Sequence, residues 1–378
     1  MNRRGFVKTL LNWSALTAMS CVARKGVPFA EAGVLPPTAL KQLGAHCGLR
    51  IGSAISKNQL YQFPGFASFF TSNFNLLTPN SEMKWSALRP ASDRYDFTAA
   101  DAIVSFAQTN GIAIHGHNLC WNTGNPTWLA DALTSGNAKT ILQAHIKTVM
   151  TRYKGRMDSW DVVNEPIGIW FGRPDGLYGG PWVEALGPEY LDIAFFTAAE
   201  VDPKPLRILN VHNVEHGDPD SAKARQATIN LATRLVRNHV PIQAVGIESH
   251  LDAWRPIDTP ALTVFVKTLR DLGLQVLVTE FDVNDSKISG GIAARDQAVA
   301  SYYHSYISAF YAAAGTPNRL ILWSPTDREN WMNYAQNVLR WQRDDGDRTH
   351  RPGILDDNMN PKPSFFALAS AIQSIRRN

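Results

Sequence analysis

The sequence has few cysteines, and their spacing does not suit a metal ion. Three cysteines, Cys21, Cys47 and Cys120, are spread over 378 residues. This count excludes a disulfide-rich framework, and the separations fit no zinc motif. Without the N-terminal segment, Cys47 and Cys120 permit one disulfide but do not require it. No cofactor or metal motif is present, so we expect the protein to need neither.

Long apolar runs, long basic runs and short internal repeats are also missing. No stretch reaches the ~20 apolar residues that span a bilayer, so we expect no stable membrane span. The net charge of +4 is dispersed among 19% charged residues, which argues against nucleic acid as a partner. A hydrophobic content of 44% is typical of a soluble globular protein with a large core.

The first 32 residues have the pattern of a targeting segment. Arg3-Arg4 precedes a mildly apolar run over residues 9–23. This pattern predicts export to the periplasm or the medium through a twin-arginine-like signal. Cys21 is a poor match to a lipid-attachment site, although lipid anchoring stays open. The alternative is a basic N-terminus on a cytosolic enzyme.

Residues 33–378 read as one domain in which strands and helices alternate. Buried parallel strands appear as short apolar runs, and amphipathic helices show a 3.6-residue period. The expected strands are 47–54, 74–78, 112–117, 157–163, 206–211, 242–247, 275–279 and 320–323. The expected helices are 66–70, 98–109, 138–153, 189–200, 221–238, 261–271, 293–314 and 364–375. Eight strands, each followed by a helical segment, favour an α/β fold of the (β/α)8 TIM-barrel type over a doubly wound sheet.

Two glutamates follow two of these predicted strands. Strand 157–163 ends in Asn164 and Glu165, and strand 275–279 leads into Glu280. Chemistry in such barrels takes place at the carboxyl ends of the strands. A pair of carboxylates there is what glycoside hydrolysis requires. The alternative is that both are solvated or salt-bridged loop carboxylates.

Other strand ends carry polar and aromatic side chains that a purely structural barrel would not need. Any one of them could be a packed structural residue, but together they predict a sugar-binding cleft. They are Asn75, Lys84, His117, Trp121, Trp128, Asn210, His212, Asn213, Glu248, His250, Asp282, Trp323, Asp327 and Trp331. Trp160 is expected in the core, where Trp85 and Trp182 could also lie, and Asp161 could be a buried partner that holds a strand end.

The chemistry of an acetal assigns roles to these groups. Glu165 as the acid would need its pKa raised by partial burial or by a neighbouring anionic Glu280. Glu280 would be the ionised nucleophile. His250 and Asp282 could orient Glu280 through hydrogen bonds, and the amide of Asn164 could bind a sugar hydroxyl beside the cleaved bond.

Over residues 45–375 the chain resembles glycoside hydrolase family 10, the endo-1,4-β-xylanases. The motifs that carry the resemblance occur in the family's order. They are Met83-Lys84-Trp85, 116–121, 160–166, 246–251, 279–282, Trp323 with Asp327 and Trp331, and Pro361-Lys362-Pro363.

The resemblance implies the same barrel, hydrolysis with retention, and roles for individual residues. Glu165 would be the acid/base and Glu280 the nucleophile. The groups implied to surround the sugar before the cleaved bond are Lys84, His117, Trp121, Asn164, His250 and Trp323. Asn80 and Trp331 are further expected substrate contacts.

The chain departs from the family pattern at several of these positions. Asn80-Ser81 stands where Glu-Asn is usual, and Glu248 stands where the family has Gln. The other departures are Asn122, Val211-His212 and Ser324. We hypothesise that Glu248 raises the apparent pKa of the catalytic pair by like-charge repulsion and shifts the working pH.

Three functions remain open at this point. The first is a retaining endo-β-1,4-xylanase, which acts as a monomer on a polysaccharide. The second is a retaining glycosidase of the same barrel type that acts on another β-linked glycan or a glycoside. The third is a carbohydrate-binding protein that has lost catalysis, which the presence of both glutamates argues against.

Overall fold

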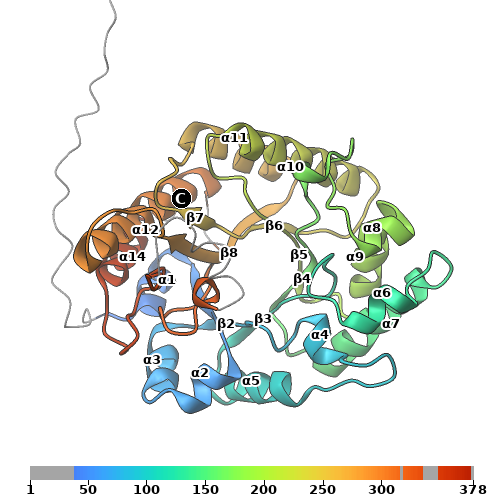
Figure 1. The fold of residues 1–378 in the computed structure, drawn as a ribbon, viewed down its shortest axis with the longest axis horizontal. Helices are drawn as coiled ribbons and strands as arrows, with labels where there is room; N and C mark the ends of the chain where they lie inside the picture. The colour runs from blue at the N-terminus through green and yellow to red at the C-terminus, as the bar shows by residue number, and fades with distance from the viewer. Residues whose placement is uncertain (1–37, 316–317, 335–347, 376–378) are drawn as a thin grey trace, which may run out of the picture.

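In the computed structural model the chain folds into a closed barrel of parallel strands inside a ring of helices (Figure 1). The structure describes residues 38–315, 318–334 and 348–375. The predicted export segment, including Arg3-Arg4 and Cys21, lies outside these residues. Among those described, no helix is long and apolar enough to cross a membrane.

Eight parallel strands of the described chain make the barrel. In chain order they are β1 (Arg50–Ile55), β2 (Leu76–Pro79), β3 (Ala113–Gly116), β4 (Ser159–Asn164), β5 (Leu206–Val211), β6 (Ala244–Ile247), β8 (Gln275–Asn284) and β9 (Arg319–Leu322). Each pairs with the next, and β9 pairs with β1 to close the ring. A short strand, β7 (His250–Asp252), pairs with the end of β8. The (β/α)8 barrel predicted from the sequence is confirmed.

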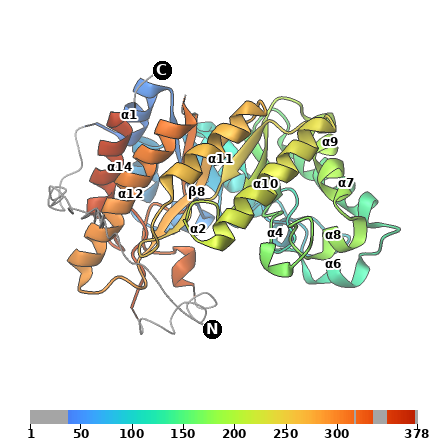
Figure 2. The ribbon, with the colours of Figure 1, turned by 90° about the horizontal axis from the view of Figure 1, so that it is seen from above.

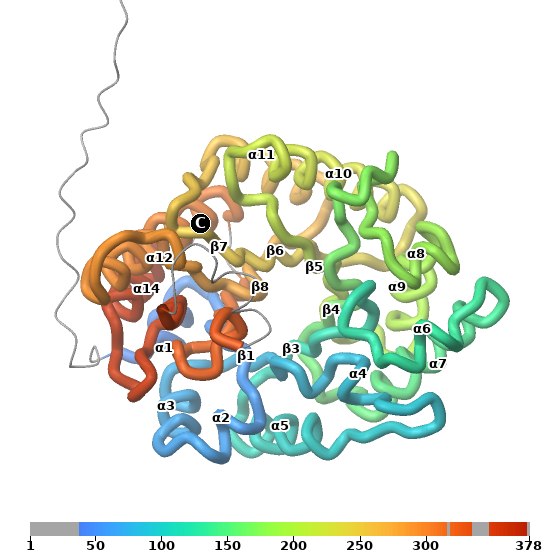
Figure 3. The backbone as a smooth tube through the Cα atoms, in the orientation of Figure 1, coloured from blue at the N-terminus to red at the C-terminus, as the bar shows by residue number. Residues whose placement is uncertain are grey.

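Helices surround the strands on the outside, as Figures 2 and 3 show. Among the described residues, the helices of eight or more residues are α1 (Leu40–Cys47), α3 (Phe66–Asn73), α5 (Thr98–Thr109), α7 (Ala138–Tyr153), α9 (Glu189–Val201), α10 (Pro219–Arg237), α11 (Thr259–Asp271), α12 (Ile292–Ala314) and α14 (Pro363–Ser374). Shorter pieces are α2 (Lys57–Gln62), α4 (Trp85–Leu88), α6 (Thr127–Ala132), α8 (Pro181–Leu186), η1 (Ile169–Phe171) and η2 (Trp331–Asn333). They follow strand ends or lie within the loops.

The first predicted strand was wrong at its start. Cys47 is the last residue of α1, and the chain reverses at Gly48, whose φ of +78° is a left-handed conformation that suits glycine. Strand β1 begins at Arg50. Cys47 and Cys120 are buried thiols, and no disulfide joins them.

Strand β8 is longer than predicted and runs to Asn284. Glu280 and Asp282 therefore lie inside a strand rather than after its end. The extension has a physical cause, because β7 supplies a pairing edge: His250, Leu251 and Asp252 pair with Asp282, Val283 and Asn284. This pairing also brings His250 beside Asp282.

The core contains the tryptophans that the sequence analysis placed there. Trp160 and Trp182 are fully buried and Trp85 nearly so. Trp160 occupies the space beside Gly116, where a Cβ atom would lie only 2.1 Å from its ring. The interpretation of these three tryptophans as core residues is confirmed.

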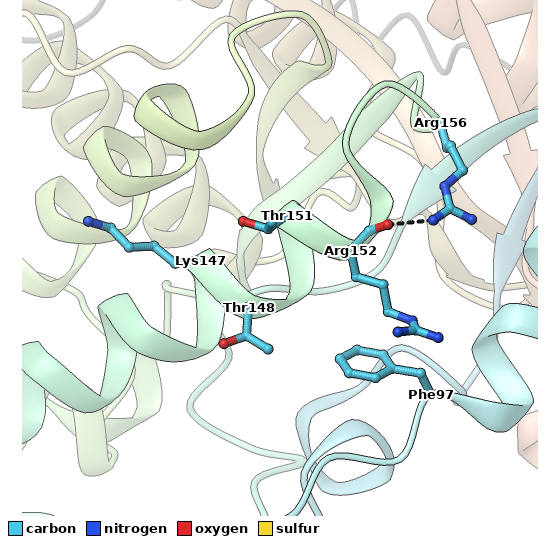
Figure 4. Close-up of a pocket in the computed structure, with 6 residues that line it drawn as sticks. All are labelled: Phe97, Lys147, Thr148, Thr151, Arg152 and Arg156. Atoms are coloured by element: carbon cyan, nitrogen blue, oxygen red, sulfur yellow. Dashed lines mark hydrogen bonds between the residues drawn. The ribbon is translucent and has the colours of Figure 1, made fainter.

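A hollow on the outside of the barrel involves none of the predicted site residues. It is lined by Phe97, Lys147, Thr148, Thr151, Arg152 and Arg156 (Figure 4). The Arg152 guanidinium lies 4.4 Å from the centre of the Phe97 ring and pairs with Asp101. These contacts explain the hollow as packing between α5 and α7.

Candidate active site

Four neighbouring strands bring the predicted carboxylates and amides to one end of the barrel. Glu165 follows β4, and its backbone N–H donates to the carbonyl of Asn210 on β5, 2.9 Å away. Glu280 on β8 donates its backbone N–H to the carbonyl of Glu248 after β6, at 3.0 Å. Glu165 has a φ of +46°, a left-handed conformation that is uncommon for a residue with a side chain and recurs at functional sites.

The amide of Asn210 is the centre of this arrangement. Its Nδ2 donates to Oε1 of Glu280 at 2.7 Å and to Oδ1 of Asn164 at 2.8 Å. Its Oδ1 accepts from the hydroxyl of Thr279 at 2.6 Å, which fixes the direction of the amide. Asn164 in turn donates to Oε1 of Glu165 at 3.4 Å. One chain of hydrogen bonds therefore links the two glutamates. The ~5 to 5.5 Å carboxyl separation of a retaining pair stays a prediction.

Glu280 lies between two histidines that favour its charged form. Nε2 of His250 donates to it at 3.2 Å, and Nδ1 of His117 is 3.6 Å away. Burial opposes ionisation, but the two histidines outweigh it and keep the pKa of Glu280 below its usual value. An ionised carboxylate is the state that a nucleophile needs.

His250 is held by Asp282, as the sequence analysis expected. Its Nδ1 donates to Oδ1 of Asp282 at 2.7 Å, and the other oxygen of Asp282 accepts from the indole N–H of Trp331 at 2.7 Å. Although burial works against it, the charge of Asp282 and the contact with Glu280 raise the pKa of His250 well above its usual value. Hydrogen bonds therefore run without a break from Trp331 through Asp282 and His250 to Glu280.

A second buried carboxylate supports His117. Asp161 accepts from His117 at 2.9 Å and from His115 at 2.8 Å. Burial disfavours its charge, but the two histidines lower its pKa. Asp161 is therefore the buried partner that the sequence analysis proposed, and His115 is a residue that it missed.

Lys84 and three tryptophans lie around the carboxylates. The Lys84 ammonium is 5.3 Å from the Trp121 ring and 5.8 Å from the Trp323 ring. Burial lowers the pKa of Lys84, and the nearby carboxylates oppose this shift. The Trp323 ring meets His117 edge-on at 5.0 Å, and Trp331 lies 5.0 Å from His250.

Of the residues that depart from the family pattern, one lies among the catalytic groups and two are buried in contacts outside them. Glu248 lies in the amide network, with Oε1 3.3 Å from Nδ2 of Asn210 and Oε2 3.9 Å from Nε2 of His250. Asn122 is buried and donates to the hydroxyl of Tyr190 at 3.4 Å, so it belongs to the wall. Ser324 is buried and accepts from Gln59 at 3.2 Å.

The loop after β2 carries the other changed pair. Asn80 is buried, and the hydroxyl of Ser81 donates to its Oδ1 at 3.4 Å. The backbone N–H of Ser81 donates to Glu82 at 3.0 Å. A contact between Asn80 and substrate stays a prediction.

Two exposed aromatic residues just after Glu165 were missed from the sequence. Trp170 is 56% exposed and Phe171 is 45% exposed, both in η1. The Trp170 ring meets His212 edge-on at 5.5 Å, and His212 contacts the carbonyl of Ile167 at 3.3 Å. Two adjacent bulky aromatics following a functional glutamate and a proline were the signal that could have found them.

Within the described part of the chain, two sets of side chains are close enough to hold a cation. They are His117, Asp161 and Glu280, and Glu248, His250 and Glu280, with ligand atoms within 4.8 Å of one another in each set. Both sets share Glu280, and the imidazole nitrogens that face it also face other carboxylates. This is the geometry of proton-sharing pairs, and the expectation of no metal stays a prediction.

Comparison with known proteins settles the family. The family model described as Glycosyl hydrolase family 10 matches residues 39–371. The chain belongs to this family. A family 10 chain is a glycoside hydrolase, which agrees with the paired glutamates at the end of its barrel.

Related family 10 proteins match along most of their length. The chain is 32% identical over 329 residues to "Beta-1,4-xylanase" of Dictyoglomus thermophilum, which covers 84% of this chain and 87% of the relative. It is 29% identical over 346 residues to "Endo-1,4-beta-xylanase B" of Thermotoga neapolitana, covering 88% and 91%. The crystal structure of xylanase 10B from Thermotoga petrophila RKU-1 in complex with xylobiose is similar, with a TM-score of 0.78, 27% identity, and coverage of 90% of this chain and 98% of that one.

Proposed function

We propose that this protein is a retaining endo-1,4-β-xylanase that hydrolyses internal β-1,4 bonds of xylan by a two-glutamate double displacement. The observation that carries the proposal is the amide chain through Asn164 and Asn210, which ties Glu165 to an ionised Glu280. The xylanase names of relatives that match over most of both chains support xylan as the substrate.

In the first step, the Glu165 carboxylic acid gives its proton to the oxygen that leaves, and the bond from this oxygen to the anomeric carbon breaks. The Glu280 carboxylate forms a bond to the same carbon from the opposite face. His250 and Asn210 hold Glu280 in place, because each donates a hydrogen bond to a different one of its oxygens. The product is a glycosyl ester of Glu280 and a free sugar chain.

In the second step, Glu165 is a carboxylate and accepts a proton from water while the water oxygen attacks the anomeric carbon. The ester bond to Glu280 breaks, and Glu280 leaves as a carboxylate. Both glutamates return to their starting states. Two inversions give net retention.

The surroundings of Glu165 support attack within a long chain. The exposed rings of Trp170 and Phe171 follow Glu165 closely in the chain and lie in η1. Flat apolar sugar faces stack on such rings, so this surface suits further units of a polymer. Lys84, Trp121 and Trp323, which lie together, would enclose the sugar before the cleaved bond.

A second substrate class has specific support. Asn80-Ser81 and Glu248 replace family residues near the sugar, and Glu248 adds a third carboxylate beside Glu280. These changes would suit another β-linked glycan or a glycoside. The non-catalytic alternative conflicts with a complete acid and nucleophile pair.

Product analysis separates these functions. Purified protein would be tested on xylan, carboxymethylcellulose and aryl β-xylosides, with Glu280→Ala as the blank, and the anomer first released would be identified by NMR. We expect xylo-oligosaccharides of mixed length from xylan, with the β-anomer first. Turnover of only another glycan would support the second function, and binding without turnover of any substrate would support the third.

We also propose that residues 1–32 direct export of a monomer. The sequence pattern around Arg3-Arg4 supports the export part. Replacing both arginines by lysine in the full chain should leave the enzyme in the cytoplasm. Export at the wild-type level, or a dimer in size-exclusion chromatography with light scattering, would contradict the respective part.

A further inference from the structure

The hydrogen bonds around Asn210 do not balance if every neighbouring carboxyl group is ionised. Its Nδ2 has two hydrogens but faces three acceptors: Glu280 at 2.7 Å, Asn164 at 2.8 Å and Glu248 at 3.3 Å. The amide cannot be turned over, because Thr279 donates to its Oδ1 at 2.6 Å and a flip would point this oxygen at two carboxyl groups. Two hydrogens cannot make three full hydrogen bonds, so one of the three acceptors lacks a donor from Asn210. The longest of the three contacts is the one to Glu248.

Glu248 has poorer hydrogen-bond donors than Glu280. Glu280 receives a short bond from Asn210 and another from His250 at 3.2 Å. The second oxygen of Glu248 is 3.9 Å from Nε2 of His250, beyond hydrogen-bond distance, and no further donor among the described residues reaches its carboxyl group. Both side chains are almost fully buried. A buried carboxylate with one long hydrogen bond is costly, whereas a neutral carboxylic acid is tolerated.

Charged groups from four other elements face Glu248. They are Glu280 on β8, Glu165 and Asp161 from the β4 end, His250 on β7 and Lys84 after β2. Burial is the largest influence and raises the pKa of Glu248 well above its usual value, and the charges of Glu280 and Glu165 raise it further. His250 opposes this, but its hydrogens are already bound by Asp282 and Glu280.

We propose that Glu248 is a neutral carboxylic acid in the working enzyme and acts as a positioning residue for the nucleophile Glu280. A neutral carboxyl group does not need the further hydrogen-bond donors that a buried carboxylate would need. Both amide hydrogens of Asn210 then remain on Asn164 and Glu280. Neutral Glu248 also leaves a single negative charge beside the reacting carbon before attack.

Loss of this proton should disturb catalysis. An ionised Glu248 would compete for the hydrogens of Asn210 and for His250, and would place a second anion within 4.8 Å of Glu280. Glu280 and Asn164 would then have to share the Asn210 amide hydrogens with Glu248. Activity should therefore fall on the alkaline side when Glu248 ionises. Like-charge repulsion from Glu248 would be absent on the acidic side, in contrast to the hypothesis drawn from the sequence.

This inference rests on the proposed function, so its test combines kinetics with a measurement that needs no turnover. The pH profile of kcat/KM on an aryl β-xyloside would be compared for wild type, Glu248→Gln and Glu248→Ala. Glu200→Gln, which makes the same substitution on the outer helix α9, is the control. Infrared difference spectra of wild type against Glu248→Gln, at mildly acidic pH, would detect the carbonyl stretch of a protonated carboxyl group.

Gln is neutral at every pH, so Glu248→Gln should leave the acidic limb unchanged and move the alkaline limb to higher pH. Glu248→Ala leaves a cavity beside Asn210 and should lose about tenfold in kcat/KM at all pH values, because Asn210 holds Glu280 in place and a small displacement of a catalytic group is costly. The infrared band of wild type should vanish in Glu248→Gln and persist in the control.

A downward shift of the acidic limb in Glu248→Gln would overturn the inference, because it would mean that Glu248 is ionised while Glu280 works. So would unchanged limbs, equal activity of the Gln and Ala variants, or an infrared band that is the same in Glu248→Gln as in wild type. If the wild-type protein cleaved no β-glycoside, the proposed function would fail, and the infrared comparison would still decide the protonation of Glu248.

Discussion

Replacement of Gly246 by alanine should disable the site through one methyl group. Gly246 lies on β6, beside its register partner Asn210 on the adjacent strand β5. A Cβ atom there would be 2.4 Å from Oδ1 of Asn210, 2.8 Å from Cγ2 of Thr279 and 3.1 Å from Cγ2 of Ile208. All three neighbours are fully buried and cannot retreat into solvent.

The size of the effect follows from the overlap. Ordinary contact begins at 3.4 Å, so Oδ1 of Asn210 must move by about 1 Å. Asn210 would lose its bond from Thr279, and its Nδ2 would shift away from Asn164 and Glu280. A misplacement of ~1 Å at a catalytic constellation costs about 100-fold in rate. Overpacking of the buried strand should also cost ~1–3 kcal/mol of stability.

Steady-state kinetics on an aryl β-xyloside and urea unfolding would measure the two effects. Gly136→Ala is the control, because Gly136 is exposed and its Cβ would meet only the Thr134 hydroxyl, at 3.9 Å. In an Asn210→Ala background the closest clash is gone, so Gly246→Ala should destabilise the protein less than in wild type. Wild-type kcat/KM for Gly246→Ala, or equal costs in both backgrounds, would refute the reasoning.

Three further predictions concern other buried or reacting groups. Glu165→Ala should lose most activity on xylan but keep the first step on aryl glycosides with good leaving groups, which need no acid; equal losses on both would contradict an acid role. His145 is stacked on Trp85 at 3.7 Å, and burial holds its pKa well below the usual value. Because the unfolded chain takes up this proton at a pH of ~6.5 and the folded protein does not, the free energy of unfolding should fall as the pH decreases below ~6.5. His145→Phe should reduce this slope in urea titrations, and an unchanged slope would refute it. Lys362→Met should destabilise by ~3 kcal/mol, because Asp327 would keep a buried charge without its 2.9 Å partner; unfolding at the wild-type urea midpoint would contradict this.

Much of the barrel could be predicted from local patterns because its strands are buried on both faces. Apolar runs such as Leu206–Val211 mark the strands directly, and the amphipathic helices Thr98–Thr109 and Ala138–Tyr153 have the bounds expected from their period. Helix α1 also carried a helical signal, since Leu40, Leu43, Gly44 and Cys47 are its buried residues. Reading Cys47 as part of a strand ignored that spacing.

The parts that could not be predicted depend on contacts between distant segments. The end of β8 is extended only because β7, about 30 residues earlier in the chain, provides an edge for Asp282 to Asn284. Likewise, Asn210 follows an apolar run like many other strand-end amides. Its role depends on Thr279, which fixes the direction of its amide, and on Gly246, which leaves space for it. Neither of these two contacts can be recognised from the sequence around Asn210.

The structure also divides the departures from the family pattern by what they can affect. Asn122 and Ser324 are buried and bonded to Tyr190 and Gln59, so their changes are absorbed in the barrel wall. Glu248 shares the Asn210 amide with Glu280 and so acts on the reacting groups directly. A difference in working pH from related xylanases should therefore trace to Glu248, and Asn122→His should leave that difference in place.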